Sequence, residues 1–238
     1  VIKEWNIGID CGFNLNKIPD HIFITHTHID HICKCSIFSY NSNNSVTYYV
    51  PNQSSKYLCN YINSGIQLCK SSNSRNFFKW IKTKELDENS IVKLKNGRNE
   101  IEIKPLICDH GVPTLGYCFY ENKNKLKKEY IGLSQSEIIN LKKNGMQIVE
   151  NIKYPQFIFV GDTTIKFFDL NPKIFELGFK TIVIECTFLL EDDYYKISEL
   201  DSKGNNKYKH IHYKDLKAFI LNNQDITFIL IHFSMRYK

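Results

Sequence analysis

The sequence has no long apolar run and no recognisable leader, and these absences exclude two classes of protein. A membrane-spanning helix needs about 18 or more consecutive apolar residues, and no such run occurs in the 238 residues. The chain also lacks an opening basic segment followed by an apolar stretch, which is the pattern of a secretory signal. We therefore expect a protein that neither spans a membrane nor is secreted. Because the chain begins at Val1 rather than at methionine, its compartment (cytoplasm, nucleus or an organelle) stays open.

Alanine and arginine are scarce, with one alanine (Ala218) and three arginines (Arg75, Arg98 and Arg236). Lysine, asparagine and isoleucine are abundant instead, as expected of a coding sequence rich in A and T. This bias accounts for part of the net charge of +6. A basic surplus suits a polyanionic partner, but here it is weak evidence for one. The 42% hydrophobic content excludes an intrinsically disordered chain.

The eight cysteines are an even number, which permits an interpretation as disulfides. A chain of this length, however, buries enough apolar surface to fold without them. Cys108, Cys118 and Cys186 lie in apolar, strand-like segments, where a thiol packs as a small hydrophobic group. The Cys-Lys-Cys sequence at 33–35 is closer than the usual zinc-binding pair and has no matching second pair. We therefore predict free thiols.

Short runs rich in β-branched and aromatic residues alternate with helical patterns along the chain. These runs predict strands at Trp5–Asp10, His21–Thr25, Val46–Val50, Ile101–Cys108, Tyr117–Tyr120, Phe157–Val160, Thr181–Glu185 and Ile226–His232. Apolar spacing and capping residues predict helices at Gln53–Asn63, Ser134–Asn144 and His212–Asn222. Polar loops are expected at Asn41–Ser45 and Ser71–Asn76. No repeat or domain boundary is visible, so we predict one α/β domain over residues 1–238.

The strongest functional signal is the sequence Thr-His-Thr-His-Ile-Asp-His at 25–31, directly after an apolar run. His26 and His28 are two residues apart, so an extended segment points both side chains the same way. Asp30 and His31 then turn towards a second position. Neutral imidazoles and a carboxylate are ligands that zinc prefers. Four such residues within six positions favour a metal site over a polar loop with chance histidines.

Further residues of ligand type follow other predicted strands. His110, Asp162 and His232 each stand at or directly after the end of an apolar run. Ligand sites of α/β proteins commonly lie at the carboxyl ends of strands. A lone aspartate in this place is more often a turn or cap residue, but together these three residues and the 25–31 sequence complete a set for two metal ions.

Other motifs occur in a fixed order around these residues. They are Asp10-Cys-Gly12, His110-Gly-Val-Pro-Thr-Leu-Gly-Tyr117, Gly161-Asp-Thr163, Glu185-Cys-Thr-Phe188, His210-Ile-His212 and His232-Phe-Ser-Met-Arg-Tyr237. The His-X-His-X-Asp-His pattern resembles the signature of the metallo-β-lactamase fold. The glutamate motif, His210 and the closing motif narrow the resemblance to short-form ribonuclease Z, the tRNA 3′-processing endonuclease, and most closely to its plant-type short form.

This resemblance implies an α/β metallo-β-lactamase fold, which is a four-layer αβ/βα sandwich. The family has strands before the Asp-Cys-Gly turn and a helix after the last motif, so we expect both ends to be trimmed. The resemblance also implies two Zn²⁺ per subunit. One ion would be held by His26, His28 and His110, the other by Asp30, His31 and His232, with Asp162 bridging them.

The resemblance further assigns catalytic roles to Asp30, Glu185 and His210. Asp30 would lie beside the activated water as a base or orienter. His210 with Glu185 would give a proton to the leaving oxygen, because a carboxylate orients an imidazole and raises its pKa. Two alternatives stay open from the residues alone: His212 in place of His210 as the acid, and Glu185 as a salt-bridge residue at a strand end.

Substrate contacts are expected from two parts of the chain. Ser234 and Arg236 would contact a substrate phosphate, with Arg236 offering its planar fork, unless Arg236 merely pairs with a carboxylate. A short basic insertion at about 121–150 stands in place of the family's long tRNA-binding arm. Its Lys125, Lys127 and Lys128 would contact the tRNA backbone, unless they form only a solvated face.

The function implied is a zinc-dependent endoribonuclease that acts on precursor tRNA. It would remove the 3′ trailer by metal-activated water attack on the phosphodiester and leave a 3′-hydroxyl on the tRNA. By the same resemblance we expect a homodimer. The alternatives are another hydrolase of the fold, such as a small phosphodiesterase or thioester hydrolase, and a non-catalytic RNA-binding protein, although such a protein would usually have lost ligands.

Overall fold

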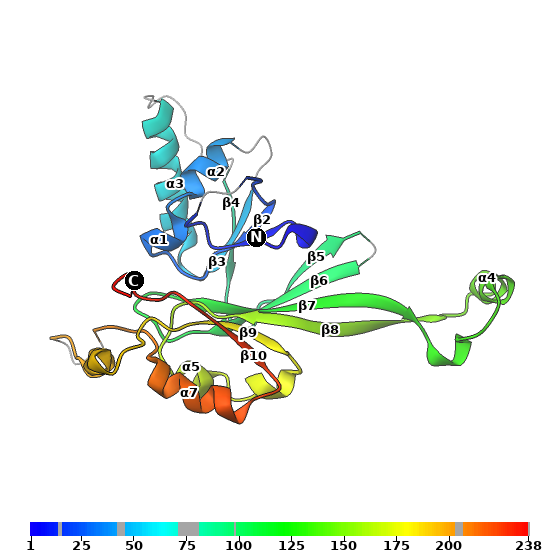
Figure 1. The fold of residues 1–238 in the computed structure, drawn as a ribbon. Helices are drawn as coiled ribbons and strands as arrows, with labels where there is room; N and C mark the ends of the chain where they lie inside the picture. The colour runs from blue at the N-terminus through cyan, green and yellow to red at the C-terminus, as the bar shows by residue number, and fades with distance from the viewer. Residues whose placement is uncertain (14–15, 42–45, 71–80, 98, 203–206, 238) are drawn as a thin grey trace.

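Figure 1 shows the computed structural model of the chain, which describes residues 1–13, 16–41, 46–70, 81–97, 99–202 and 207–237. Two β-sheets face each other, and helices cover the outer side of each. The first sheet is parallel and contains β1 (Ile7–Ile9), β2 (His21–Phe23), β3 (Thr47–Pro51) and β4 (Lys82–Leu86), in that order. The second sheet has the order β10-β9-β8-β7-β6-β5, with β5 (Val92–Asn96), β6 (Asn99–Ile107), β7 (Leu115–Leu126), β8 (Val149–Phe159), β9 (Thr181–Glu185) and β10 (Thr227–Ile231).

The helices divide between the two outer faces and an arm. The α-helices are α1 (Ile29–Ile32), α2 (Cys35–Asn41), α3 (Ser55–Lys70), α4 (Gln135–Lys143), α5 (Phe167–Leu170), α6 (Tyr195–Ser198) and α7 (Tyr213–Asn222). Short 3₁₀ turns are η1 (Lys3–Trp5), η3 (Lys128–Tyr130), η4 (Ile174–Leu177) and η5 (Glu191–Asp193). In Figure 1, α1, α2 and α3 lie outside the first sheet, and α5 and α7 lie outside the second. This layering confirms the predicted αβ/βα sandwich.

Alternation along the strands builds three apolar layers. Successive strand residues point to opposite faces of a sheet, so Ile22 and Ile24 pack against α2 and α3 whereas Phe23 faces the other sheet. Tyr117 and Phe119 of β7 meet Phe23 between the sheets. The outer face of the second sheet packs against the aromatic side chains of α5 and α7. Burial of these apolar layers holds the two sheets in a fixed relation.

The sequence pattern did not predict strands β4 and β5, because both are rich in lysine. β4 reads Lys-Thr-Lys-Glu-Leu and β5 reads Val-Lys-Leu-Lys-Asn, and only Leu86 and Val92 of the two strands are buried. Each strand lies at the edge of its sheet. Charged residues, lysine above all, are common on edge strands because they prevent pairing with other chains. A hydrophobic pattern is therefore a weak guide at these positions.

The basic insertion forms an arm that the sequence pattern did not predict. β7 and β8 pair in antiparallel fashion from Tyr117–Phe159 to Leu126–Val149, well beyond the apolar part of either strand. Figure 1 shows this hairpin projecting from the body, with α4 at its tip. α4 begins with a capping box between Ser134 and Glu137, and its bounds agree closely with the predicted helix.

The remaining expectations concern loops, thiols and membranes. The predicted polar loops fall largely on residues 42–45 and 71–76, outside the described residues. All eight cysteines are free thiols, and six of them are buried. In the part of the chain that the structure describes, every helix is too short or too polar to cross a membrane.

Candidate metal centre

Five strands deliver the predicted site residues to one edge of the sandwich. β6, β8, β9 and β10 run in the same direction within the second sheet, so their carboxyl ends share an edge. His110, Asp162, Glu185 and His232 follow or end these four strands. The sequence at 25–31 follows β2 of the other sheet and meets them there. The prediction that ligands gather at strand ends is therefore reflected in the topology.

In the described part of the chain, the histidines and carboxylates form five overlapping groups of possible metal ligands; two of them are the predicted sets, and His210 belongs to two of the others. In the first group, His28 Nδ1 lies 3.0 Å from His26 Nε2 and 3.2 Å from His110 Nε2. In the second group, His31 Nε2 and His232 Nε2 lie 3.4 Å and 3.7 Å from Asp30 Oδ2. Within each group the potential ligand atoms all lie within 4.8 Å of one another. Such close groups of imidazole nitrogen and carboxylate oxygen suit zinc-type ions.

Asp162 lies between the two groups. Its Oδ2 is 3.8 Å from His26 Nε2 in the first group and 3.2 Å from His232 Nε2 in the second. The side chain is almost fully buried. Burial raises the pKa of Asp162 to about 6, although neighbouring histidines partly oppose this shift. A buried carboxylate in this place needs positive charge beside it.

Burial keeps the first histidine group neutral. Burial and the neighbouring histidines lower the pKa of His26 far below its usual range and that of His110 to about 4. Burial also lowers the pKa of His28. A neutral imidazole presents a free lone pair, which is the form that binds a metal.

Asp10 orients the second group, a role that the sequence did not reveal. Its Oδ2 accepts a hydrogen bond from His31 Nδ1 at 2.8 Å, and its Oδ1 accepts one from the Thr25 backbone N–H at 2.7 Å. Burial lowers the pKa of His31, but the hydrogen bond and charge of Asp10, with two further carboxylates, outweigh it and raise the pKa to about 9. A carboxylate on one ring nitrogen directs the other towards a metal.

Glu185 and His210 form the hydrogen-bonded pair expected of them. His210 Nδ1 lies 2.8 Å from Glu185 Oε1, and Glu185 is only 1% exposed. Burial lowers the pKa of His210, but the bond to Glu185 and its charge prevail and raise it overall. Glu185 also accepts hydrogen bonds from the backbone N–H of Thr163 at 3.0 Å and from the Thr187 hydroxyl at 2.8 Å.

His212, unlike His210, contacts backbone groups near the start of α7. It is buried, with Nε2 donating to the Leu190 carbonyl and Nδ1 accepting the Lys214 backbone N–H at the start of α7. Both ring nitrogens are thus occupied by backbone groups. His212 caps α7, and of the two histidines only His210 contacts Glu185 in the structure.

A hollow of about 660 Å³ opens beside the first histidine group. Its lining residues are His28, His110, Gly111, Asp201, Lys207, Tyr208, Lys209 and His210. His110 Nδ1 lies 2.9 Å from the Lys209 carbonyl oxygen, and Lys209 Nζ donates to Asp109 Oδ1 at 3.0 Å. The 207–210 segment therefore orients His110 and forms a wall of the hollow.

The residues predicted to contact the substrate lie after β10 and on the β7 arm. Arg236 pairs with the carboxylate of Asp193, which is the alternative that the sequence left open, while its side chain stays 45% exposed. Ser234 donates its backbone N–H to the Thr187 carbonyl at 3.1 Å. The lysines at 125, 127 and 128 stand on and just beyond the β7 arm, away from the centre (Figure 1).

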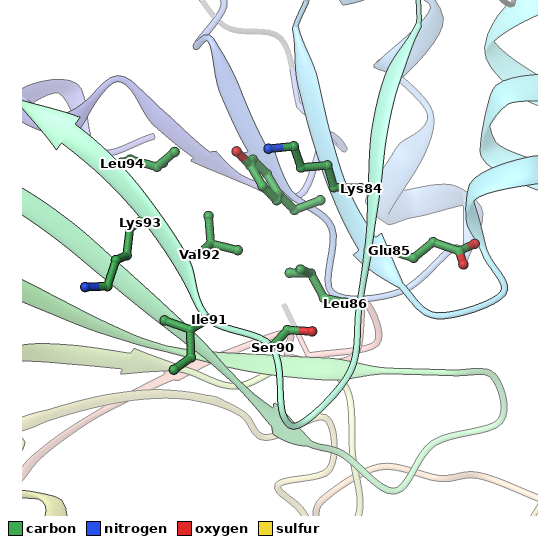
Figure 2. A pocket seen from close by; sticks show the side chains of 9 residues that line it. Lys84, Glu85, Leu86, Ser90, Ile91, Val92, Lys93 and Leu94 are labelled. Carbon is green, nitrogen blue, oxygen red and sulfur yellow. The ribbon is translucent and has the colours of Figure 1, made fainter.

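A second hollow lies elsewhere on the sandwich. Figure 2 shows its lining from β4, β5 and the turn between them, and its volume is about 620 Å³. The lining side chains include Lys84, Glu85 and Lys93, and also Tyr49 of β3. None of the predicted site residues lines it.

Replacing Gly12 by alanine is expected to weaken metal binding. A Cβ at Gly12 would lie 2.0 Å from the backbone oxygen of Asp30, so the segment that carries Asp30 and His31 must shift. Overpacking of this kind typically costs about 1–3 kcal/mol of stability. Thermal unfolding and zinc titration would measure both effects. Gly111→Ala is the matched control, because nothing lies within 4 Å of its Cβ, and it should change neither quantity. Equal behaviour of the two variants would contradict the prediction.

The chain is similar in sequence to two plant tRNase Z proteins. No protein-family model matches the chain. tRNase Z TRZ1 of Arabidopsis thaliana is 37% identical over 140 residues, which are 59% of this chain and 48% of that protein. The chloroplastic tRNase Z TRZ2 of the same plant is 32% identical over 141 residues, 59% of this chain and 38% of that protein. The chain thus spans half or less of the length of these relatives.

A solved structure supports the fold. The long form RNase Z from yeast superposes with a TM-score of 0.51 at 14% identity, covering 98% of this chain and 32% of that one. The clustered histidines and carboxylates at the strand ends could hold metal ions. The chain has the metallo-β-lactamase fold, and its sequence is related to those of the plant tRNase Z proteins.

Proposed function

We propose that this chain is a single-domain, zinc-dependent endoribonuclease that removes the 3′ trailer from precursor tRNA. One observation carries the proposal: two groups of metal-ligand type flank Asp162, and His210, hydrogen-bonded to the buried Glu185, lies beside them. Another hydrolase of the fold needs the ligand groups but has no need of that pair. The relationship to proteins named tRNase Z supports the same substrate.

Two Zn²⁺ ions would be held by these groups. His26, His28 and His110 would bind one ion, and Asp30, His31 and His232 the other. Asp162 would bridge them, since its Oδ2 faces histidines of both groups. When bound, such a pair of ions supplies an activated water and neutralises charge on the reacting phosphate.

Residues of the chain would transfer protons and orient the reacting groups. Glu185 holds His210 with Nδ1 as the donor, so Nε2 is the atom that would give a proton to the leaving oxygen. The Thr163 and Thr187 hydrogen bonds hold the Glu185 carboxylate in place. Asp30, which is exposed and belongs to the second group, would accept or orient a proton of the attacking water.

The surroundings suit a polyanionic substrate. Lys207 and Lys209 line the hollow next to His110 and His210, where a strand leaving the cleavage site would pass. The arm carries Lys125, Lys127 and Lys128 away from the body, in reach of a more distant part of a tRNA (Figure 1). Arg236, whose side chain stays 45% exposed beside Asp193, would contact a phosphate together with Ser234. The active form would be a homodimer.

The proposal is tested by cleavage of a 3′-extended precursor tRNA. We expect the zinc-loaded chain to cut after the discriminator base and leave a 3′-hydroxyl, and a chelator to stop the reaction until zinc is returned. Gel analysis against a sequencing ladder measures the position of the cut. A folded, zinc-loaded chain that leaves the precursor intact but hydrolyses a small phosphodiester would point to the other class of hydrolase.

A further inference from the structure

The buried carboxylate of Asp193 contacts Arg236 and Tyr237 in the segment after β10. Its side chain is only 6% exposed. Oδ1 contacts the Arg236 guanidinium and also Lys196 Nζ at 3.1 Å. Oδ2 accepts a hydrogen bond from the Tyr237 hydroxyl at 2.5 Å. A buried carboxylate with three charged or polar partners fixes the position of all of them.

These contacts tie the segment after β10 to the segment after β9. The Tyr237 hydroxyl, while donating to Asp193, accepts the Leu189 backbone N–H at 2.9 Å. The Ser234 backbone N–H donates to the Thr187 carbonyl at 3.1 Å. The chain from 234 to 237 is therefore held at both ends against 187–193.

His232 stands at the root of this segment in a strained conformation. Its φ of 62° is in the left-handed region, which is uncommon for residues other than glycine and persists where the surrounding structure supports it. His232 Nδ1 lies 3.0 Å from Thr187 Oγ1, and Nε2 is turned to Asp162 Oδ2 at 3.2 Å. Thr187 contacts the His232 ring itself, and the Asp193 contacts anchor side chains of the segment that directly follows it.

We propose that Asp193 is a positioning residue: by clamping Arg236 and Tyr237 it holds His232 in the conformation that binds the second metal ion. The inference rests on the proposed metal centre but not on the proposed substrate. Arg236 would then help to align His232. Loss of the clamp should weaken metal binding only at the second ligand group, because His26, His28 and His110 contact one another and the Lys209 carbonyl instead of the clamp.

The test is zinc titration of the metal-free chain by calorimetry. Asp193→Asn should weaken the second ion about 10–100-fold, as loss of a residue that orients a ligand usually does, and leave the first ion unchanged. Tyr237→Phe, which keeps every charge, should weaken the same ion selectively. Asp225→Asn is the matched control: Asp225 pairs with Lys180 just before β10, but both side chains are about two-thirds exposed, and it should change neither ion.

The outcomes separate the two claims. If the unaltered chain binds two ions and Asp193→Asn and Tyr237→Phe bind both ions equally well, the inference is wrong while the metal centre stands. Equal weakening of both ions would show a merely structural role and would also overturn it. If the unaltered chain binds fewer than two ions, the proposed centre fails and the inference with it. Should Asp193→Asn not fold, as judged by circular dichroism, Tyr237→Phe decides.

Discussion

Asp162→Ala is expected to abolish cleavage and to remove at least one of the two metal ions. Asp162 Oδ2 faces His26 in one group and His232 in the other, so its loss affects both groups at once. It also leaves the imidazoles of the two groups without the carboxylate between them. Changing a residue that merely orients a ligand already costs about 10–100-fold in metal affinity, so the loss here should exceed about 100-fold.

Zinc content per folded chain and the rate of precursor cleavage measure this effect. Asp162→Asn is the graded variant, because it keeps the shape of the side chain and one oxygen but removes the charge. Its zinc content and cleavage rate should fall between those of the unaltered chain and those of Asp162→Ala. Asp225→Ala, at an exposed position, is the control for loss of an aspartate. Undiminished cleavage by Asp162→Ala would refute a bridging role.

His210→Ala is expected to keep both metal ions and yet slow cleavage by about 10²–10⁴-fold, the usual contribution of a general acid. His210 belongs to neither of the two proposed ligand groups, and its Nδ1 is engaged by Glu185 at 2.8 Å. Single-turnover cleavage under saturating enzyme measures the chemical step, and zinc content is measured on the same sample. Loss of zinc from His210→Ala would instead make His210 a ligand.

His212 provides the matched comparison two residues away. His212→Ala removes the side chain that caps α7, and loss of a cap costs about 0.5–2 kcal/mol of stability. We therefore expect a lower unfolding temperature with nearly unchanged cleavage below it. A rate loss in His212→Ala as large as in His210→Ala would reopen the choice between them.

The convergence of the ligands was predictable because strand direction dictates it. His110, Asp162 and His232 all follow apolar runs that are easily read as strands, and parallel strands bring their carboxyl ends to one edge. The capping residues likewise placed α4 correctly. Local signals of this kind survive in a single sequence because each depends on neighbours within a few positions.

Contacts between segments far apart in the chain could not be predicted from the sequence. Asp10 was recognised as part of a turn, but its bond to His31 joins residues 21 positions apart. Asp193 sits in the acidic sequence Glu-Asp-Asp at 191–193, which has the composition of an exposed surface, and only the fold buries it among three partners. The lysine-rich strands β4 and β5 and the outer part of the β7–β8 arm were missed for a related reason: edge and arm positions need no apolar pattern.

The number of zinc ions bound per folded chain shows whether Asp162 joins two metal ions in one centre. The metal-free chain is saturated with Zn²⁺, free metal is removed, and the ion is counted by elemental analysis alongside Asp162→Ala. The expectation is two ions in the unaltered chain and at most one, bound more weakly, in the variant. A folded chain that binds no zinc, or whose zinc count and affinity are the same with and without Asp162, would contradict it.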